Sequence, residues 1–295
     1  MDVSVIIVNY NTKTLTSDCI DSIIEKTQGV DYEIILVDNM SEDGSKEFFE
    51  SDERLSTYIY NNTNYGFGIA NNIGMKAAKG KYFFLLNSDT LLVNNAIKEF
   101  FDYAEKNDDG SVYGCYLVDK NNADNLSYFD FPAFTVSEFI KKRFFRTLKK
   151  EDYSIKYVEA ITGADLFVPR RTIELIGGFN PNIFLYGEES ELQYRMKKKG
   201  IARIILPMPK IIHFGKQSMT FSVLKQVKML DSSFTVLKLH MNTPTYLLAR
   251  IYYAANYSLR ALLCLLNGRN GAKEIFLGAF RRVELKDYDL KFYED

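Results

Sequence analysis

The chain of 295 residues is long enough to bury a sizeable core in one large domain or two small ones. Hydrophobic residues make up 46% of it and include 20 Tyr and 22 Phe, which excludes a disordered chain. The net charge of −1 gives no indication of a nucleic acid as partner, and we expect none.

The first part of the sequence alternates segments that resemble strands and helices. Short apolar runs, rich in β-branched or aromatic residues, predict buried strands at 3–8, 33–37, 57–60 and 82–86. Apolar residues at helical spacing, or short helix-like stretches, predict helices at 13–27, 44–50, 68–79 and 94–106. This alternation predicts an α/β fold with a mostly parallel central sheet flanked by helices.

Regular patterns return after an irregular stretch at about 120–156. YVEAITGADLFVPR (157–170) predicts strand structure with a break at the small residues Gly163 and Ala164. GEESELQYRMKKKG (187–200) predicts a helix, because acidic residues begin it and Lys residues precede the final Gly200. ARIILP and KIIHF predict two further short strands.

Polar residues follow each of the first four predicted strands. They are Asn9-Tyr10-Asn11, Asp38-Asn39, Asn61-Asn62 and Asn87-Ser88-Asp89. Any one of these groups is explained by a turn, since Asn and Asp bond to their own backbone. In parallel sheets, however, ligands bind outside the carboxyl ends of the strands. Four such groups on one edge favour a polar ligand.

Asp89 is the candidate metal ligand at this edge. A diphosphate leaving group departs poorly unless its charge is neutralised, and a divalent cation does this with only one or two carboxylates from the protein. Asn87 is a weaker cation ligand and is better suited to ribose or phosphate.

The loop NTNYGFGIANNIGMKAAKG (62–80) has a structural and a functional interpretation. Its glycines, Gly66 and Gly68, permit close approach of the backbone, and small residues on one face let the helix lie close to the sheet. Asn71 and Asn72 fall off that face, where exposed amides could meet phosphate or sugar hydroxyls. The sequence leaves both interpretations open.

The acidic residues at the start of the 187–200 helix differ in what they predict. Glu191 precedes Arg195 by four residues, which is typical of an exposed ion pair. Glu189 shares a face with Leu192, and an inward carboxylate is costly unless it is used. Glu189 is therefore the candidate general base, with Glu188 positioning an acceptor hydroxyl. His213, at a strand end, is either structural or a further metal ligand.

These motifs in combination resemble glycosyltransferase family 2, which has the GT-A fold, and in particular its rhamnosyltransferase-like branch in bacterial polysaccharide synthesis. The resemblance covers roughly residues 3–218. It rests on VSVIIVNYNT with VDNMSEDGS, on NYGFGIANNIGMKAAKGKYFFLLNSDT, on ITGADLFVPRRTIELIGGFNPNIFLYGEESELQYRMKKKG and on HFGKQS.

The resemblance implies a metal-dependent, inverting transfer of a sugar, with rhamnose favoured, from a thymidine or uridine diphosphate donor. The acceptor would be a hydroxyl of a glycan or a lipid-linked molecule, and the cofactor Mg²⁺ or Mn²⁺. Residues 1–218 would form the catalytic domain, with a nucleotide-binding half at 1–118 and an acceptor half at 157–218. Residues 219–295 would form a helical extension.

The resemblance implies a role for individual residues of these motifs. Asp38 would contact the base beside Tyr10, Asp89 and His213 would hold the metal, and Glu189 would deprotonate the acceptor. The nucleotide-sugar site would comprise Asn9, Tyr10, Asn11, Asp38, Asn39, Gly66, Phe67, Asn71, Asn72, Asn87 and Ser88, with Gly163 and Ala164 in the sugar or acceptor pocket.

The chain departs from the family pattern at two of these positions. Glu189 stands where Asp is usual, which makes the identity of the base less certain. Asn87 replaces the first carboxylate of the metal signature, which leaves all carboxylate ligation to Asp89.

Two segments suggest contact with a membrane surface. KKRFFRTLKK (141–150) is either a solvated face or a site for anionic headgroups or phosphate. The apolar stretch 243–268 contains Arg250, Asn256 and Arg260, so it packs on the domain or on a second subunit, or lies in a membrane interface.

The lack of a recognisable signal peptide and the wide spacing of the cysteines predict a cytoplasmic protein. MDVSVIIVNYN has no basic region or cleavage site of a signal peptide, and no apolar run reaches the ~18 residues of a membrane span. Cys19, Cys115 and Cys264 lie far apart, as reduced thiols do. We expect a cytoplasmic protein, peripheral on the inner face of the membrane if these two segments bind lipid.

Two competing functions remain. A sugar nucleotidyltransferase requires a Gly-rich loop after the first strand, and NYNTKTLTSD contains no glycine. A catalytically silent, nucleotide-sugar-binding subunit of an assembly complex would keep its cellular role when Glu189 is substituted.

Overall fold

The computed structural model describes residues 1–135, 137–139, 153–215, 223–266, 276–278, 280, 283–286, 288 and 290. The basic segment 141–150 and the end of the stretch 243–268 lie outside these residues.

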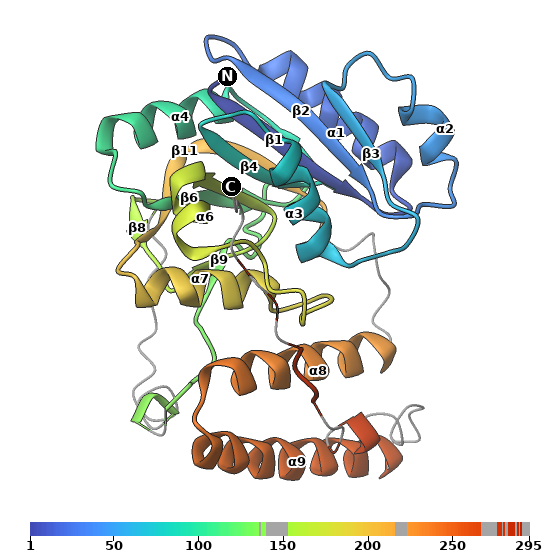
Figure 1. Ribbon diagram of the computed structural model, residues 1–295, viewed down its shortest axis with the longest axis vertical. Helices are drawn as coiled ribbons and strands as arrows, with labels where there is room; N and C mark the ends of the chain where they lie inside the picture. Colours follow the sequence, from blue (N-terminus) through green and yellow to red (C-terminus); the bar gives the residue numbers. More distant parts are fainter. Residues whose placement is uncertain are drawn as a thin grey trace.

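A mixed sheet forms the centre of the molecule (Figure 1). Its strands are β1 (Val3–Asn9), β2 (Tyr32–Asp38), β3 (Thr57–Tyr60), β4 (Tyr82–Asn87), β5 (Thr90–Leu92), β6 (Val112–Val118), β8 (Lys156–Tyr157), β10 (Asp165–Pro169) and β11 (Arg203–His213). They are ordered β3-β2-β1-β4-β10-β6-β11-β5, and β8 pairs with β11 beside this path. The four strands predicted first, β1 to β4, are mutually parallel, while β10 runs antiparallel between β4 and β6.

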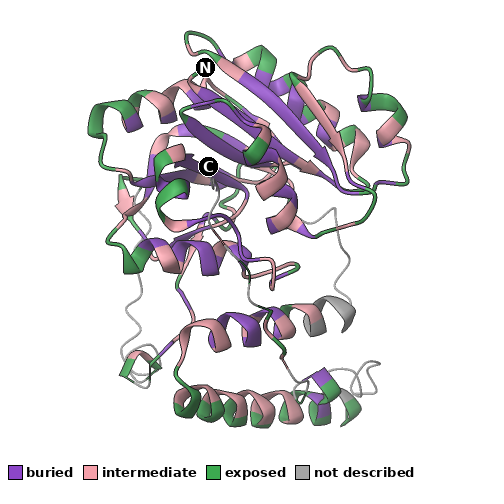
Figure 2. Cartoon of the chain, in the orientation of Figure 1, coloured by how far each residue is buried: buried purple, intermediate pink, exposed green. Residues whose placement is uncertain are grey.

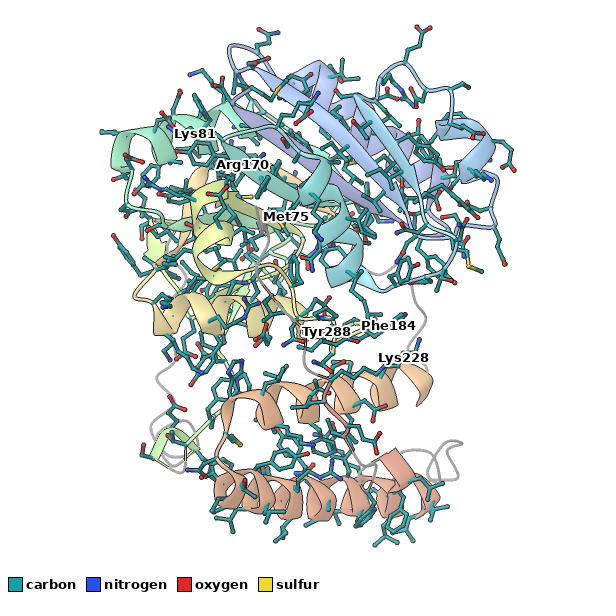
Figure 3. All side chains as sticks on the ribbon, viewed as in Figure 1. Met75, Lys81, Arg170, Phe184, Lys228 and Tyr288 are labelled. Carbon is teal, nitrogen blue, oxygen red and sulfur yellow. The ribbon has the colours of Figure 1, made fainter. Side chains whose placement is uncertain are left out.

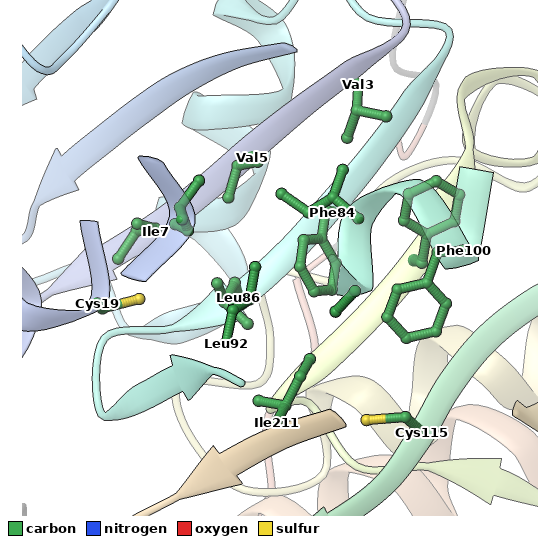
Figure 4. Packing of buried hydrophobic residues seen from close by; sticks show 14 of the residues in the cluster. Val3, Val5, Ile7, Cys19, Phe84, Leu86, Leu92, Phe100, Cys115 and Ile211 are labelled. Atoms are coloured by element: carbon green, nitrogen blue, oxygen red, sulfur yellow. The ribbon is translucent and has the colours of Figure 1, made fainter. Parts of the chain in front are cut away.

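Helices cover both faces of this sheet. One face carries α1 (Lys13–Lys26), α2 (Ser45–Phe49) and α4 (Ala96–Asn107), and the other carries α3 (Phe67–Ala77), α6 (Arg170–Ile176) and α7 (Glu188–Lys198). Side chains alternate along a strand, so Val5 and Ile7 of β1 enter the first core while Ile6 enters the second. Figure 4 shows the first core, where Phe84 lies near Phe100.

The prediction of two short strands at 202–214 is wrong, because β11 is one strand with an irregularity. Its pairing with β6 shifts register between Leu206 and Ile211. Pro207 and Pro209 lie in this interval and have no backbone N–H to donate, yet their fixed φ is compatible with an extended chain. The strand therefore continues and gains β5 as an antiparallel partner at Ile211–His213.

Two helices beyond the sheet, α8 (Val223–His240) and α9 (Thr243–Leu266), form a pair that lies against the α7 side of the molecule (Figure 1). Leu230 and Phe234 of α8 pack with Ile183 and Ala160 in a third core. Two short strands, β7 (Tyr128–Phe129) and β9 (Ala160–Ile161), pair beside this core. In the part of the chain described, no helix is both long and apolar enough to cross a membrane.

The described residues 283–286, 288 and 290 lie near the loop before α7. The Lys286 backbone N–H donates to Asn182 Oδ1 at 2.8 Å, and Asn182 Nδ2 donates to the Lys286 carbonyl at 2.8 Å. Further on, the Gly178 N–H donates to the carbonyl of Leu290 at 3.2 Å. The C-terminal segment thus fastens the 177–182 loop from outside.

Candidate active site

A cleft of about 990 Å³ opens at the carboxyl edge of β1, β2 and β4. Thirteen of the predicted site residues line it: Tyr10, Asn11, Asn39, Gly66, Phe67, Asn87, Ser88, Asp89, Gly163, Ala164, Glu188, Glu189 and His213. Four predicted residues do not line it, namely Asn9, Asp38, Asn71 and Asn72.

The β1 and β2 ends form one half of the cleft. Tyr10 is 46% exposed and lies open for stacking. Asn39 is buried, and its Nδ2 donates to Asn64 Oδ1 at 2.8 Å, which fixes the amide at the cleft wall. Asn11 adopts a positive φ of 55°, and its Oδ1 accepts from the Glu42 N–H at 2.7 Å. These bonds hold a rigid polar rim.

Asp38 and Asn9, which the sequence predicts at the nucleotide, lie beneath this rim and do not line the cleft. Both are fully buried. The Asp38 carboxylate accepts from Asn9 Nδ2 at 2.9 Å and from the Ser41 N–H at 2.8 Å. The carboxylate is therefore occupied in holding the turn after β2, and Asn39, one residue later, takes the place at the cleft.

The amides of Asn71 and Asn72, for which the sequence leaves a structural and a ligand-binding interpretation open, both donate to backbone carbonyls. Asn71 Nδ2 donates to the carbonyl of Phe67 at 3.0 Å within α3. Asn72 exchanges two hydrogen bonds with the backbone of Phe179, at 2.9 and 2.8 Å. These contacts attach α3 to the Gly-Gly-Phe turn, so the structural interpretation holds for both residues.

Asp89 and His213 meet at the centre of the cleft. Asp89 ends the turn after β4, and His213 ends β11, whose last residues pair with β5. His213 Nε2 lies 3.3 Å from Asp89 Oδ1 and 3.5 Å from Asn87 Nδ2. A hydrogen bond from the Phe214 N–H to the Asp89 carbonyl, at 3.0 Å, fixes the two chain segments together.

This pair fits a divalent cation with incomplete protein ligation. Carboxylate oxygen and imidazole nitrogen are both ligands of Mn²⁺-type cations. Among the described residues, however, no group of three or more His, Cys, Asp or Glu side chains could hold a metal. Asp89 and His213 therefore form a partial donor set, which a substrate diphosphate and water would complete.

The two glutamates at the start of α7 also line the cleft. Burial, together with the negative charge of Glu189, raises the pKa of Glu188 well above its usual value, and its Oε2 is buried without a hydrogen-bond partner. Burial likewise raises the pKa of Glu189, whose Oε2 accepts from the Gly187 N–H at 3.3 Å. A carboxylate with a raised pKa is a stronger proton acceptor.

Glu191 is buried, not exposed as the sequence suggests. Its carboxylate accepts from Arg195 Nε at 2.9 Å and lies 3.2 Å from His240 Nε2 at the end of α8. Burial opposes ionisation, yet the hydrogen bond to His240 and the charge of Arg195 lower the pKa of Glu191. This pair joins α8 to the catalytic core and has no part in the cleft.

Several residues that line the cleft were not predicted. Lys13 follows β1, Asn64 precedes the α3 helix, Phe184 and Tyr186 lie in the loop before α7, and Lys228 comes from α8. Asn64 and Lys13 lie beside predicted polar groups, which could have indicated them. No local pattern marks Lys228, because it reaches the cleft only through the packing of α8.

Comparison with known proteins identifies the family. The family model described as Glycosyl transferase family 2 matches residues 4–162. The glycosyltransferase GlyG of Streptococcus pneumoniae is 30% identical over 141 residues, which cover 46% of this chain and 46% of the relative. The poly(ribitol-phosphate) beta-N-acetylglucosaminyltransferase TarP of Staphylococcus aureus is 28% identical over 123 residues, or 40% of this chain and 37% of the relative. The chain thus spans less than half the length of these relatives.

Solved structures share the fold. The structure of GalNAc-T7 with UDP, GalNAc and Mn²⁺ aligns with a TM-score of 0.62 and 17% identity, covering 87% of this chain and 51% of the other. S. aureus TarS in complex with UDP aligns with a TM-score of 0.51 and 17% identity, covering 80% and 65%. The predicted GT-A fold is confirmed, and the chain belongs to glycosyl transferase family 2.

Proposed function

We propose that this family 2 glycosyltransferase moves a sugar, with inversion, from a nucleotide-diphosphate donor to a hydroxyl of a glycan or lipid-linked acceptor in surface polysaccharide synthesis. One observation supports the proposal: the Asp89–His213 pair and two glutamates of raised pKa line the same cleft. The first pair suits a diphosphate, and the second suits an attacking hydroxyl.

The chemistry is a single displacement. Glu189 accepts the proton of the acceptor hydroxyl, whose oxygen forms a bond to the anomeric carbon as the bond to the diphosphate oxygen breaks. Glu188 orients the acceptor beside it. Tyr10 and the Asn39 rim hold the nucleotide, and Gly163 and Ala164 leave room for the sugar. Mg²⁺ or Mn²⁺, bound by Asp89 and His213, would neutralise charge on the diphosphate.

The solved structures and the sequence motifs favour different nucleotide donors. UDP is bound in both TarS and GalNAc-T7, which favours a uridine diphosphate sugar, while the rhamnosyltransferase-like motifs favour rhamnose on thymidine diphosphate. We therefore test both nucleotides.

The test is thermal stabilisation of the purified chain by UDP, dTDP, GDP and CDP, each with and without MnCl₂ or MgCl₂. We expect metal-dependent stabilisation by one uridine or thymidine nucleotide, since a ligand that binds only the folded state raises its stability. No stabilisation by any nucleotide would contradict the proposal.

A variant that lacks the candidate base distinguishes an enzyme from a silent nucleotide-sugar-binding subunit. In a strain that lacks the wild-type protein, Glu189→Gln should abolish polysaccharide synthesis while nucleotide binding persists. A general base contributes ~10²–10⁴-fold to rate. Full function of the variant in the cell would support the silent subunit.

We also propose that the protein lies on the cytoplasmic face of the membrane, with the outer face of α9 as its lipid contact. This face exposes Leu247, Leu248, Ile251, Leu259, Leu262 and Leu266 at helical spacing (Figure 2). From Ser232 to Lys273 the sequence has basic residues and no Asp or Glu, which suits anionic lipid.

Sedimentation with liposomes tests this contact. The full chain should bind vesicles that contain phosphatidylglycerol more strongly than vesicles of phosphatidylcholine alone, and Leu248→Glu with Ile251→Glu should abolish binding. The matched control is Leu175→Glu, at an exposed position of α6, and it should leave binding unchanged. A dimer in solution that the double variant dissociates would instead assign the face to a second copy.

A further inference from the structure

Helix α8 places one cation in the cleft. Lys228 lines the cleft near the start of the helix, and its Nζ lies 5.0 Å from the ring centroid of Phe184 (Figure 3). Within the part of the chain that the structure describes, Lys228 forms no ion pair. Its charge is therefore available to a ligand.

The position of Lys228 is fixed by the docking of α8 on the 184–187 loop. Ser232 Oγ, one turn further along α8, donates to the Leu185 carbonyl at 2.6 Å. Val236, one turn beyond, lies against Gly187, where an added Cβ would meet it at 3.4 Å. Lys228 therefore lies on a wall of the cleft that α8 and the 184–187 loop form together.

The loop that carries this wall also contacts the start of α3 and, through Gly66, the polar rim of the cleft. The Phe184 carbonyl accepts from the Phe67 N–H at 3.2 Å, so the loop beneath Lys228 covers the start of α3. Gly66 fits so closely under Phe184 that an added Cβ would lie 2.1 Å from its carbonyl oxygen. Gly66 in turn accepts a hydrogen bond from Asn39 of the nucleotide rim, at 3.3 Å.

The charge of the cleft favours a further cation there. Its described acidic residues are Asp43, Asp89, Glu188 and Glu189, and its described lysines are Lys13 and Lys228. Lys13 Nζ lies near Gly44, at 3.3 Å from where a Cβ of that residue would lie. A divalent cation on Asp89 retains about one net positive charge, whereas a leaving nucleoside diphosphate carries two to three negative charges.

We infer that Lys228 is a diphosphate-binding residue, which rests on the proposed transferase function. As the bond between the anomeric carbon and the diphosphate oxygen breaks, its electron pair passes to that oxygen, and the Lys228 ammonium donates a hydrogen bond to the departing diphosphate without giving up a proton. The proton of the acceptor hydroxyl goes to Glu189. The C-terminal extension thereby completes the donor site.

Calorimetric titration of the full chain with UDP and with UMP, or with dTDP and dTMP if the wild type prefers thymidine, tests the assignment. With MnCl₂ present, Lys228→Ala should weaken diphosphate binding about 10- to 100-fold, as expected for a lost hydrogen bond between charged groups, and monophosphate binding much less. Lys228→Arg should retain most of the affinity. Lys210→Ala removes an equal charge from an exposed position of β11 and is the matched control.

The outcomes separate this inference from the proposed function. Equal affinity of wild type and Lys228→Ala for the diphosphate overturns the inference and leaves the transferase intact. A wild type that binds no nucleotide overturns both. Lys228→Met, which keeps the apolar stem over Phe184, replaces Lys228→Ala if the latter unfolds.

Discussion

Asp165 is a fully buried carboxyl group at the start of β10, directly after the Ala164 of the cleft. Its Oδ2 accepts from the Cys115 N–H at 2.6 Å, and its Oδ1 has no partner. Burial raises its pKa from 3.8 to about 7. The folded protein therefore holds a proton here that the unfolded chain releases.

The protonation of Asp165 makes stability depend on pH. The contribution of a carboxyl with a raised pKa is full below its unfolded value and is lost as the pH rises toward its folded value. Asp165→Asn cannot ionise, so its stability relative to wild type should rise between pH 3.8 and about 7, by ~4 kcal/mol at most, and then level off. Urea unfolding across this range measures the difference. A difference independent of pH would show that Asp165 is charged in the fold.

Substitution of Asp89 should leave the fold intact, because its carboxylate contacts His213 at the open cleft and not the core. Asp89→Asn should weaken metal-dependent diphosphate binding by at least ~10-fold, since an amide replaces the only carboxylate of the donor set. The melting temperature without ligand should stay close to that of wild type. Titration of each protein with UDP or dTDP, with and without MnCl₂, measures the effect. Unchanged affinity would remove Asp89 from the site.

Among the elements, the Gly177-Gly178 turn between α6 and α7 requires glycine as strictly as Gly66 does. Gly177 has φ +83°, and an added Cβ would lie 2.1 Å from the Leu290 carbonyl oxygen. Gly200 has a similar φ of +77° with nothing within 4 Å. Gly200→Ala should therefore cost only the backbone strain, ~1–2 kcal/mol, while Gly177→Ala should cost more and displace the 283–290 segment.

Chemical unfolding and limited proteolysis distinguish these two variants. Gly177→Ala should expose the 283–290 segment to protease while Gly200→Ala does not. Equal stability and equal cleavage of both would mean that the segment does not rest on the turn.

The elements themselves were largely predictable from the sequence, since strands β1 to β4 are short runs dominated by apolar residues and their ends mark the cleft. Side-chain partners were less predictable. An Asn at a strand end can line the cleft, as Asn39 does, or lie in the interior, as Asn9 does, and only the surrounding fold decides. Lys228 could not be predicted, because its role depends on packing between residues distant in sequence.

At the scale of the whole molecule, the Glu191–His240 pair joins the core to α8. His240→Ala leaves a buried carboxylate with Arg195 alone and should lower the free energy of unfolding by ~1–3 kcal/mol. A lowered pKa stabilises the fold above the usual value of 4.5, and this gain is lost as the pH falls through the folded value. The deficit of the variant should therefore shrink in acid.

Unfolding of His240→Ala at neutral and acidic pH measures this deficit. Lys198→Ala is the control, because Lys198 contacts only Nδ1 of the same ring, at 3.0 Å, and leaves the pair intact. A deficit of equal size in both variants would contradict a specific role of the pair.

The hydrogen bonds between Asn182 and Lys286 also affect the order of folding during synthesis. These two residues are 104 positions apart, so a ribosome has already made the sheet, the cleft walls and α7 before the partner of Asn182 exists. The nascent chain can assemble the sheet and α7 first, and the loop before α7 gains its last backbone contacts only near the end of synthesis.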